Sequence, residues 1–240
     1  MRIYGINPVI EALRAGRATA IRVAPRADER LTAVVRLAEE RDVPVRRVTA
    51  DELDRLVAGA RHRHQGVIAD VEDATAFSVE DLVIGAKGAA LILVLDGIED
   101  PQNVGAILRT VDAAGADGVV RQSRHAARLD GAAAKASAGA VSHVKNAEVV
   151  NIARAIEDLK QAGVWTVGLS ADAPRRYDEV DLTPPTAVVV GAEGSGLRRL
   201  VRERCDWLVS SPMLGHVESL NVSVATGIAL FEAIRQRRAK

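Results

Sequence analysis

The chain is poor in cysteine and in aromatic residues. Of its 240 residues only Cys205 is a cysteine, and aromatic side chains make up 2% of the composition. A single cysteine excludes an intrachain disulfide, and this usage is typical of a protein in a reducing compartment. The scarcity of aromatics argues against a protein that binds nucleic acid by stacking bases on an exposed aromatic platform.

An excess of one charge and a long apolar run are also lacking. Lysine and arginine total 32, as do aspartate and glutamate, so only a local basic patch could attract nucleic acid. No run reaches the length of a membrane span, and the beginning MRIYGINPV is not a signal peptide. The five histidines show no metal-ligand spacing with cysteine or carboxylates. We therefore expect a cytoplasmic protein without a metal site or a membrane partner.

Hydrophobic residues make up 48% of the chain, enough for one large or two modest domains. In residues 1–72 short helical and strand patterns alternate, which predicts a small α/β domain. We expect helices at 7–16, 28–41 and 51–58, and strands at 21–24, 43–48 and 66–71. Residues 73–88 show weak periodicity and are interpreted as a linker.

The densest basic spot of the first domain is Arg61-His62-Arg63-His64-Gln65-Gly66. Two interpretations carry about equal weight. One is a solvated loop, and the other is a contact for RNA phosphates, since guanidinium groups match phosphate geometry.

Residues 89–240 alternate between strand and helix patterns. We expect strands at 91–95, 118–121, 164–169, 187–190 and 207–210, and helices at 104–114, 131–139 and 151–162. The continuous aliphatic run 91–95 is typical of a strand buried on both faces of a parallel sheet. This alternation predicts an open parallel sheet that binds ligands at the carboxyl ends of its strands.

Three loops of this second domain carry polar residues. In residues 95–110, LDGIEDPQNVGAILRT, Asn103 stands at a helix start and Arg109 projects from a face other than the buried stripe. Taken alone, an N-cap and a solvated arginine explain both. Residues 188–197, VVVGAEGSGL, form a glycine-rich loop that is neither a dinucleotide fingerprint nor a P-loop. Glu193 inside that loop would repel phosphate and favours a ligand with a cationic or hydroxyl group.

The third loop opens SPMLGHVESLNVSVATGIALFEAIRQRR, residues 211–238. A helix is predicted to start near Asn221, for which Ser219 and Asn221 are good N-caps. The helix is apolar on several sides, which is typical of burial in a large core or under a partner subunit.

Because all three loops follow strands of one sheet, we expect them to converge on one pocket lined by Asn103, Arg109, Glu193, Ser219 and Asn221. The chain shows no Ser/His/Asp set with recognisable spacing and no carboxylate pair placed for glycoside chemistry. A transferase whose cosubstrate carries the reactive group fits better than a hydrolase.

The SpoU (TrmH-like) branch of the SPOUT methyltransferases has three signature motifs, which resemble LDGIEDPQNVGAILRTVDAAG, VVVGAEGSGL and SPMLGHVESLNVSVATGIALFEA of this chain. All three occur in order and with about the family spacing. The stretches YGINPVIEAL and HQGVIADV resemble the small substrate-binding domain of the same enzymes, which is similar to RNA-binding ribosomal proteins. The resemblance implies an α/β chain with an RNA substrate-binding domain at 1–72, a linker at 73–88 and a methyltransferase domain at 89–240. That second domain would contain a parallel sheet and a deep trefoil knot, an exception to the usual unknotted rule.

The resemblance also implies a cosubstrate, a partner and roles for particular residues. S-adenosylmethionine should bind mainly through backbone around Gly191, Ser211, Met213, Leu214 and Leu220. Most relatives have an aliphatic residue in place of Ser211, which should matter little for a backbone contact. The enzyme should be a homodimer with its active site at the interface. Arg109 should reach in from the other subunit, and Asn103, Glu193, Ser219 and Asn221 should orient Arg109 and the ribose.

The activity so implied is methylation of a ribose 2′-hydroxyl in RNA. A guanosine in the peptidyl-transferase region of large-subunit ribosomal RNA is the favoured substrate. A tRNA ribose or another rRNA nucleotide remains an alternative, and a non-catalytic RNA-binding assembly factor is the alternative from another class. A Rossmann oxidoreductase is disfavoured because the fingerprint is lacking.

Overall fold

The computed structural model describes residues 1–25, 28–57, 64–72, 77–129 and 131–239. The chain divides into two compact units, Met1–Ala74 with Arg128–His143, and Thr75–Ala127 with Val144–Lys240. We call them unit 1 and unit 2 and describe each by itself. Within the described ranges, no helix is long and apolar enough to cross a membrane.

Unit 1 has a four-stranded sheet in the order β1-β4-β2-β3, with only β2 and β3 parallel. Its strands are β1 (Arg2–Tyr4), β2 (Ala18–Val23), β3 (Val45–Arg47) and β4 (Val67–Val71). Its helices are α1 (Ile6–Arg14), α2 (Glu29–Glu39), α3 (Ala50–Leu56) and α6 (Gly131–Ala136), with the 3₁₀ turn η1 (Ala140–Ser142). The helices and strands predicted in residues 1–72 are all present, and β1 was not predicted.

Local chemistry explains where the helices of unit 1 begin. The side chain of Asp28 accepts a hydrogen bond from the backbone N–H of Arg30 and caps α2. Helix α1 has no capping side chain of its own. Gln65 Oε1 instead accepts from the backbone N–H of Ile6 at 3.0 Å, so a residue distant in sequence satisfies an orphan donor of the first turn.

Of the basic spot at 61–66, residues 61–63 lie outside the described part of the chain. His64 is buried, and its Nδ1 accepts from the backbone N–H of Gly66 at 2.9 Å. Its Nε2 lies 3.3 Å from the carboxylate of Asp54. His64 therefore has a structural place in the fold, and an RNA contact for the three residues before it stays a prediction.

The stretch 128–143 belongs to unit 1, although it lies inside the predicted methyltransferase domain. Arg17 donates to the carbonyl of Val141 at 3.1 Å, and His143 Nε2 lies 3.0 Å from the carboxylate of Glu11. Its alanine-rich residues carry no periodic signal that could have revealed partners so distant in sequence.

Unit 2 contains a seven-stranded sheet in which all neighbouring strands are parallel, which confirms the predicted architecture. In spatial order its strands are β7 (Asn146–Val149), β6 (Gly118–Gln122), β5 (Leu91–Asp96), β10 (Thr186–Gly191), β8 (Trp165–Leu169), β11 (Trp207–Ser210) and β9 (Arg175–Arg176). Every residue of β5 is buried, as its aliphatic run predicted. Strands β7 and β9 were not predicted, because both are short, β7 is half polar and β9 consists of two arginines.

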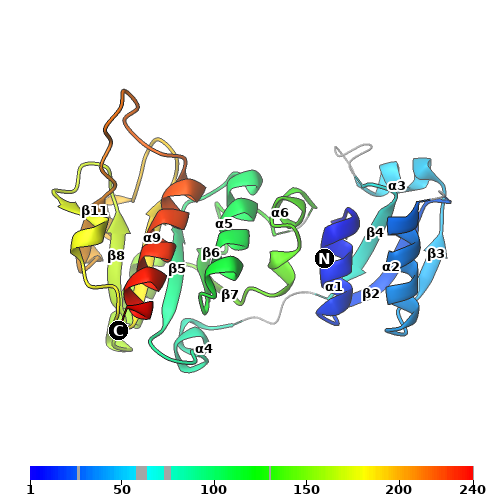
Figure 1. Cartoon of the computed structure of the whole chain (residues 1–240), viewed down its shortest axis with the longest axis horizontal. Helices are drawn as coiled ribbons and strands as arrows, with labels where there is room; N and C mark the ends of the chain where they lie inside the picture. The colour runs from blue at the N-terminus through cyan, green and yellow to red at the C-terminus, as the bar shows by residue number, and fades with distance from the viewer. Residues whose placement is uncertain (26–27, 58–63, 73–76, 130, 240) are drawn as a thin grey trace. The chain divides into compact units, whose positions relative to one another are not determined.

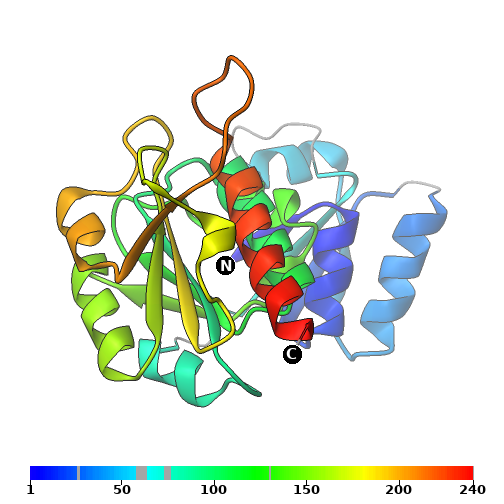
Figure 2. The same cartoon turned by 60° about the vertical axis from the view of Figure 1, so that its left-hand side comes forward.

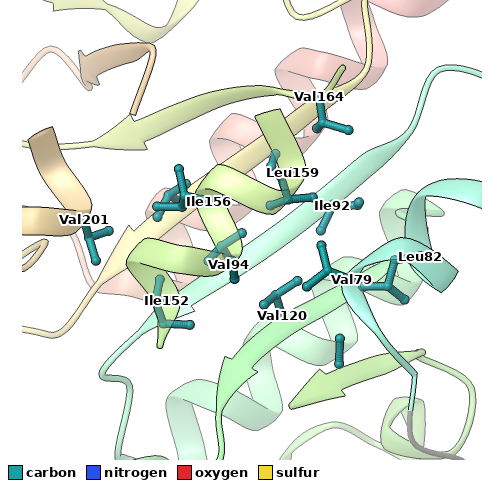
Figure 3. Close-up of a cluster of buried hydrophobic side chains, with 14 of the residues drawn as sticks. Val79, Leu82, Ile92, Val94, Val120, Ile152, Ile156, Leu159, Val164 and Val201 are labelled. Carbon is teal, nitrogen blue, oxygen red and sulfur yellow. The ribbon is translucent and has the colours of Figure 1, made fainter. Parts of the chain in front are cut away.

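Helices cover both faces of this sheet (Figures 1 and 2). The helices of unit 2 are α4 (Val79–Ile84), α5 (Pro101–Ala114), α7 (Ile152–Gln161), α8 (Arg199–Arg204) and α9 (Val222–Arg238), with the 3₁₀ turn η2 (Tyr177–Glu179). Helices α4, α7 and α8 bury Leu82, Ile156 and Val201 against one face, where Ile92 and Val94 of β5 meet them (Figure 3).

The predicted linker at 73–88 differs from the structure. Ser78 opens α4 with a capping box that includes Asp81, and Val79 and Leu82 are buried in the core of unit 2. The helix has six residues, and a pattern of 3.6 residues per turn is not recognisable over so short a stretch. The residues from Phe77 onward therefore belong to the sheet domain.

Candidate functional site

Three polar loops meet at the carboxyl ends of the central strands of unit 2. The chain runs outward from β5 through β6 to β7, then crosses to β8, and β10 fills the gap between β5 and β8. Such a reversal of strand order leaves a crevice at the carboxyl ends, which is where open parallel sheets bind ligands. The three motifs predicted from sequence follow β5, β10 and β11, so they surround this crevice.

The glycine loop, residues Gly191 to Arg198, is compact because its backbone segments touch. A Cβ added at Gly191 would lie 2.1 Å from the carbonyl carbon of Gly196, a distance that no side chain tolerates. The backbone N–H of Gly196 donates to the carbonyl of Ala192 at 2.8 Å. Gly194 and Gly196 have φ of +79° and +66°, which glycine adopts without strain. The loop therefore holds Glu193 at a fixed place on the sheet edge.

A buried ion pair anchors the end of this loop to β5. Asp96 is fully buried and accepts hydrogen bonds from Arg198, at 2.8 Å from its backbone N–H and at 2.6 Å from Nε. Because the guanidinium of Arg198 is half-exposed, the buried carboxylate gains hydrogen bonds and a counter-charge while only one of the two charges is fully buried. Sequence reasoning missed this pair, although a carboxylate that ends a wholly apolar strand was a signal for it.

Asn221 joins the three motifs. Its Nδ2 donates to Oδ1 of Asn103 at 2.9 Å and to Oε1 of Glu193 at 2.7 Å. Its Oδ1 accepts from the backbone N–H of Ser223 at 2.9 Å and caps α9. Asn221 therefore caps the helix as predicted, and its role as a site residue stays a prediction. Asn103 is buried at the start of α5, where Asp100 supplies the cap.

A pocket, here called the glycine pocket, opens between the glycine loop and the segment after β11. Of the residues predicted for the cosubstrate and the site, it is lined by Gly191, Glu193, Ser211, Met213, Ser219 and Leu220. Leu214 does not line it, and its side chain is 98% exposed. Ser170 and Glu218 also line the pocket, and sequence reasoning did not single them out.

One wall of the glycine pocket is held by charge. Ser170 Oγ and the guanidinium of Arg202 both hydrogen-bond the carboxylate of Asp172, at 2.6 and 2.8 Å. Arg202 also donates to Ser170 Oγ at 2.9 Å. These contacts, led by Arg202, lower the pKa of Asp172 from 3.8 to about 2. The carboxylate thus stays ionised at neutral pH and ties the turn after β8 to α8.

Arg109 is not brought to this pocket within one chain. It is exposed on α5 and lines neither the glycine pocket nor any other pocket found at the sheet edge. No residue that the structure describes forms a hydrogen bond or an ion pair with it. The arrangement can bind a ligand and orient a hydroxyl through Asn103 and Glu193, but a single chain offers no cation beside them from α5.

Two family descriptions match the chain. The SpoU rRNA Methylase family matches residues 90–231, and the family described as RNA 2′-O ribose methyltransferase substrate binding matches residues 2–76. The first match contains all three loops of the site.

Similar proteins match over nearly the whole chain. The 23S rRNA (guanosine-2′-O-)-methyltransferase RlmB of Pseudomonas syringae pv. tomato is 44% identical, covering 100% of this chain and 97% of that protein. An uncharacterized tRNA/rRNA methyltransferase of Mycolicibacterium gilvum is 45% identical, covering 98% and 76%. The crystal structure of the AdoMet-bound rRNA methyltransferase from Sinorhizobium meliloti matches with a TM-score of 0.78 and 25% identity, covering 98% of this chain and 86% of that one.

Proposed function

Since the chain belongs to the SpoU rRNA methylase family, we propose that it methylates the 2′-hydroxyl of a guanosine in large-subunit ribosomal RNA, with S-adenosylmethionine as the methyl donor. The observation that carries this proposal is the hydrogen-bonded group of Asn103, Asn221 and Glu193, here called the rim, of which Glu193 lines the glycine pocket. The relative named RlmB supports the choice of guanosine and of 23S rRNA. We place the nucleotide in the peptidyl-transferase region and the protein in the cytoplasm.

The lining of the glycine pocket suits S-adenosylmethionine. Cofactor sites combine apolar walls with a few placed polar groups. Val209, Met213 and Leu220 offer apolar surface to an adenine ring, and Glu218 offers a carboxylate to an ammonium group or to ribose hydroxyls. When bound, the cosubstrate supplies an electrophilic methyl group. The AdoMet-bound relative from Sinorhizobium meliloti supports this choice of ligand.

The glycine pocket is smaller than this ligand requires. Its volume is about 220 Å³, whereas pockets that enclose a drug-sized ligand commonly measure roughly 300–1,000 Å³. Leu214 and Val217, in the segment after β11, are 98% and 63% exposed, so little packing holds that segment in place. We therefore infer that residues 211–220 move outward when the cosubstrate binds.

The residues of the rim position the acceptor ribose. Methyl transfer requires the attacking oxygen to be aligned with the methyl group and to lose its proton. Because Asn221 donates to Oδ1 of Asn103 and to Oε1 of Glu193, it fixes both side chains. The amide nitrogen of Asn103 and the second oxygen of Glu193 remain for the ribose hydroxyls, and Ser219 adds a hydroxyl at the same rim.

Arg109 is proposed to enter the site from the partner subunit of a homodimer. A guanidinium stays protonated in proteins, so its role is to anchor a phosphate and stabilise the developing alkoxide. Val224 and Phe231 of α9 are each 51% exposed, and a second copy of the chain would cover them. Arg109→Lys should lower kcat at least about tenfold at unchanged cosubstrate affinity, because lysine lacks the planar fork. Methylation near wild type would refute the role, and Arg154→Lys serves as the control.

A mixing experiment tests whether the site is shared. Arg109→Ala and Asn221→Ala are each expected to be inactive as homodimers. If Arg109 acts in the partner's site, co-refolded mixtures contain mixed dimers with one intact site, and activity returns to about a quarter of wild type. If Arg109 acts in its own subunit, no activity returns. Light scattering of the wild-type protein establishes the dimer itself.

The division of labour between the domains is also proposed. Residues 1–72 would select the RNA, and unit 2 would carry the chemistry and the trefoil knot. The family match to a substrate-binding description supports the first assignment. A chain lacking residues 1–72 should bind S-adenosylmethionine in calorimetry and should methylate rRNA much more slowly. Normal rRNA methylation by the truncated chain would refute the assignment.

The function itself is tested by a methyl-transfer assay on rRNA and tRNA fragments followed by mapping of the modified nucleotide. A 2′-O-methylguanosine in large-subunit rRNA is the expected product. Methylation of tRNA, or of another rRNA nucleotide, would replace the proposed substrate. RNA binding without methyl transfer or binding of S-adenosylmethionine would identify a non-catalytic assembly factor.

A further inference from the structure

A second pocket lies beside the glycine pocket on the same edge of the sheet. Its volume is about 450 Å³, and it is lined by the segments that follow β5, β6 and β10. It shares Ala192, Glu193 and Gly196 with the glycine pocket. In the order β6-β5-β10-β8-β11, one pocket therefore lies on each side of the end of β10. Glu193 stands in the wall between them.

Gln122, the last residue of β6, lines this second pocket with an unsatisfied group. Gln122 is only 7% exposed, and its Oε1 has no hydrogen-bond partner among the described residues. The register that pairs Leu95 with Arg121 puts Gln122 beside Asp96 at the sheet edge. A buried acceptor without a donor costs about 1–3 kcal/mol, so a ligand that supplies a donor there would recover this free energy.

Most other acceptors of the second pocket are already engaged. Asp96 holds Arg198, Asp100 caps α5, and Glu193 accepts from Asn221. Glu99 is exposed, and no residue in the described ranges bonds or pairs with its carboxylate. Besides the second oxygen of Glu193 at the shared wall, the pocket thus offers two acceptors, Gln122 Oε1 and the Glu99 carboxylate, to a ligand rich in hydrogen-bond donors. Negative charge makes it unsuitable for a phosphate.

We propose that the second pocket binds the guanine base of the acceptor nucleotide, an inference that rests on the proposed function. Guanine is the RNA base whose Watson–Crick edge presents two adjacent donors, N1–H and the 2-amino group. Enzymes that act on one nucleotide extrude its base into a pocket and read that edge. The Gln122 amide turns into the pocket, so that Oε1, which is covered in the free protein, accepts from the 2-amino group, and Glu99 accepts from N1–H. The ribose then lies at the shared wall, next to Asn103 and Glu193.

Two base analogues test the two contacts separately. The substrate is an rRNA fragment in which the guanosine methylated by the wild-type protein is replaced by inosine, which lacks the 2-amino group, or by 2-aminopurine riboside, which lacks N1–H together with O6. Wild-type kcat/KM should fall about tenfold with each, since a good base contact is worth roughly 1–3 kcal/mol. Gln122→Met should bring the guanosine-to-inosine ratio close to one. Glu99→Met, which likewise removes the acceptor oxygens, should do the same for the guanosine-to-2-aminopurine ratio.

These ratios do not depend on how much of a variant is folded, because both substrates are assayed with the same protein preparation. Gln122→Glu keeps an acceptor and should keep the preference over inosine. Gln161→Met and Glu80→Met, exposed positions on α7 and α4, should leave both ratios unchanged. The proposal is overturned if the wild-type protein accepts the analogues equally well, or if both ratios survive in Gln122→Met and Glu99→Met. If the wild-type protein methylates no guanosine, both the proposed function and this subsite are refuted. If the enzyme is active but its ratios stay unchanged in the Gln122 and Glu99 variants, only the subsite is refuted.

Discussion

The two walls of the glycine pocket are held in opposite ways. The glycine loop is fixed by a backbone hydrogen bond across it and by the buried pair of Asp96 and Arg198. Opposite it, residues 213–219 form no hydrogen bond with any residue that the structure describes, and Leu214 is 98% exposed. A fixed wall can hold Glu193 in place for chemistry. A wall with few contacts can open at low free-energy cost and admit the ligand.

The sharpest test of this contrast compares a glycine from each wall. Gly191→Ala puts a Cβ 2.1 Å from backbone of Gly196, so the loop has to move, at a cost of about 3 kcal/mol or more. We expect loss of S-adenosylmethionine binding in calorimetry. Gly215→Ala is the matched control, since nothing lies within 4 Å of its added Cβ and its φ is ordinary. Equal effects of the two substitutions would show that the walls do not differ in this way.

The anchor of the fixed wall should be the next most sensitive element. Asp96→Asn removes the charge that accepts from the backbone and the guanidinium of Arg198. Denaturant unfolding should report a loss of about 2 kcal/mol, because hydrogen bonds to a buried charged group are among the stronger ones. Asp112→Asn, on the exposed side of α5, should change the free energy of unfolding by less than about 0.5 kcal/mol.

The loosely held wall should respond to ligand. Chymotrypsin cleavage after Leu214 should be rapid in the free protein, since this residue is exposed and its segment lacks hydrogen bonds. Saturating S-adenosylmethionine should slow the cleavage several-fold, because the displaced segment packs on the ligand through Met213 and Leu220 and is held in the liganded state. Identical cleavage rates with and without the cosubstrate would contradict the inferred movement of residues 211–220.

The smallest expected effect concerns the acid stability of the turn after β8, where Arg202 and Ser170 hydrogen-bond the carboxylate of Asp172. Because the pKa of Asp172 falls from 3.8 to about 2 on folding, its contribution is complete above about pH 4. It is lost as pH falls through about 2, where half of the carboxyl groups are protonated in the folded state. Relative to wild type, Asp172→Asn should therefore lower the thermal unfolding midpoint more at pH 5 than at pH 2. If the midpoints of wild type and Asp172→Asn differ by the same amount at pH 5 and at pH 2, the ion pair with Arg202 is not the cause of that difference.

Most of the architecture could be predicted from local pattern, and the failures have physical causes. The run of β5 and the cap Asn221 identified a buried strand and a helix start, because burial and capping leave local signatures. Helix α4 and strands β7 and β9 are too short for a periodic pattern to be recognised.

For the site, the residue types were predictable and most of their contacts were not. Asn103, Glu193 and Asn221 were selected because amides and carboxylates in loops after parallel strands meet at one sheet edge. The unsatisfied Gln122 escaped selection, since a glutamine at a strand end has no distinctive spacing. Leu214, chosen with its neighbours for the cosubstrate, points to solvent in the single chain.

The amino-acid sequence by itself determined the alternation of strands and helices, the parallel sheet and the three loops that carry polar groups. These features depend on residues near one another in the chain, through burial, capping and turn chemistry. The tertiary structure alone decided that Asn221 bonds two other loops, that Arg198 anchors on Asp96, and that a second pocket lies across β10. Strand order sets those neighbours, and strand order is chosen by the packing of the whole sheet rather than by any local stretch.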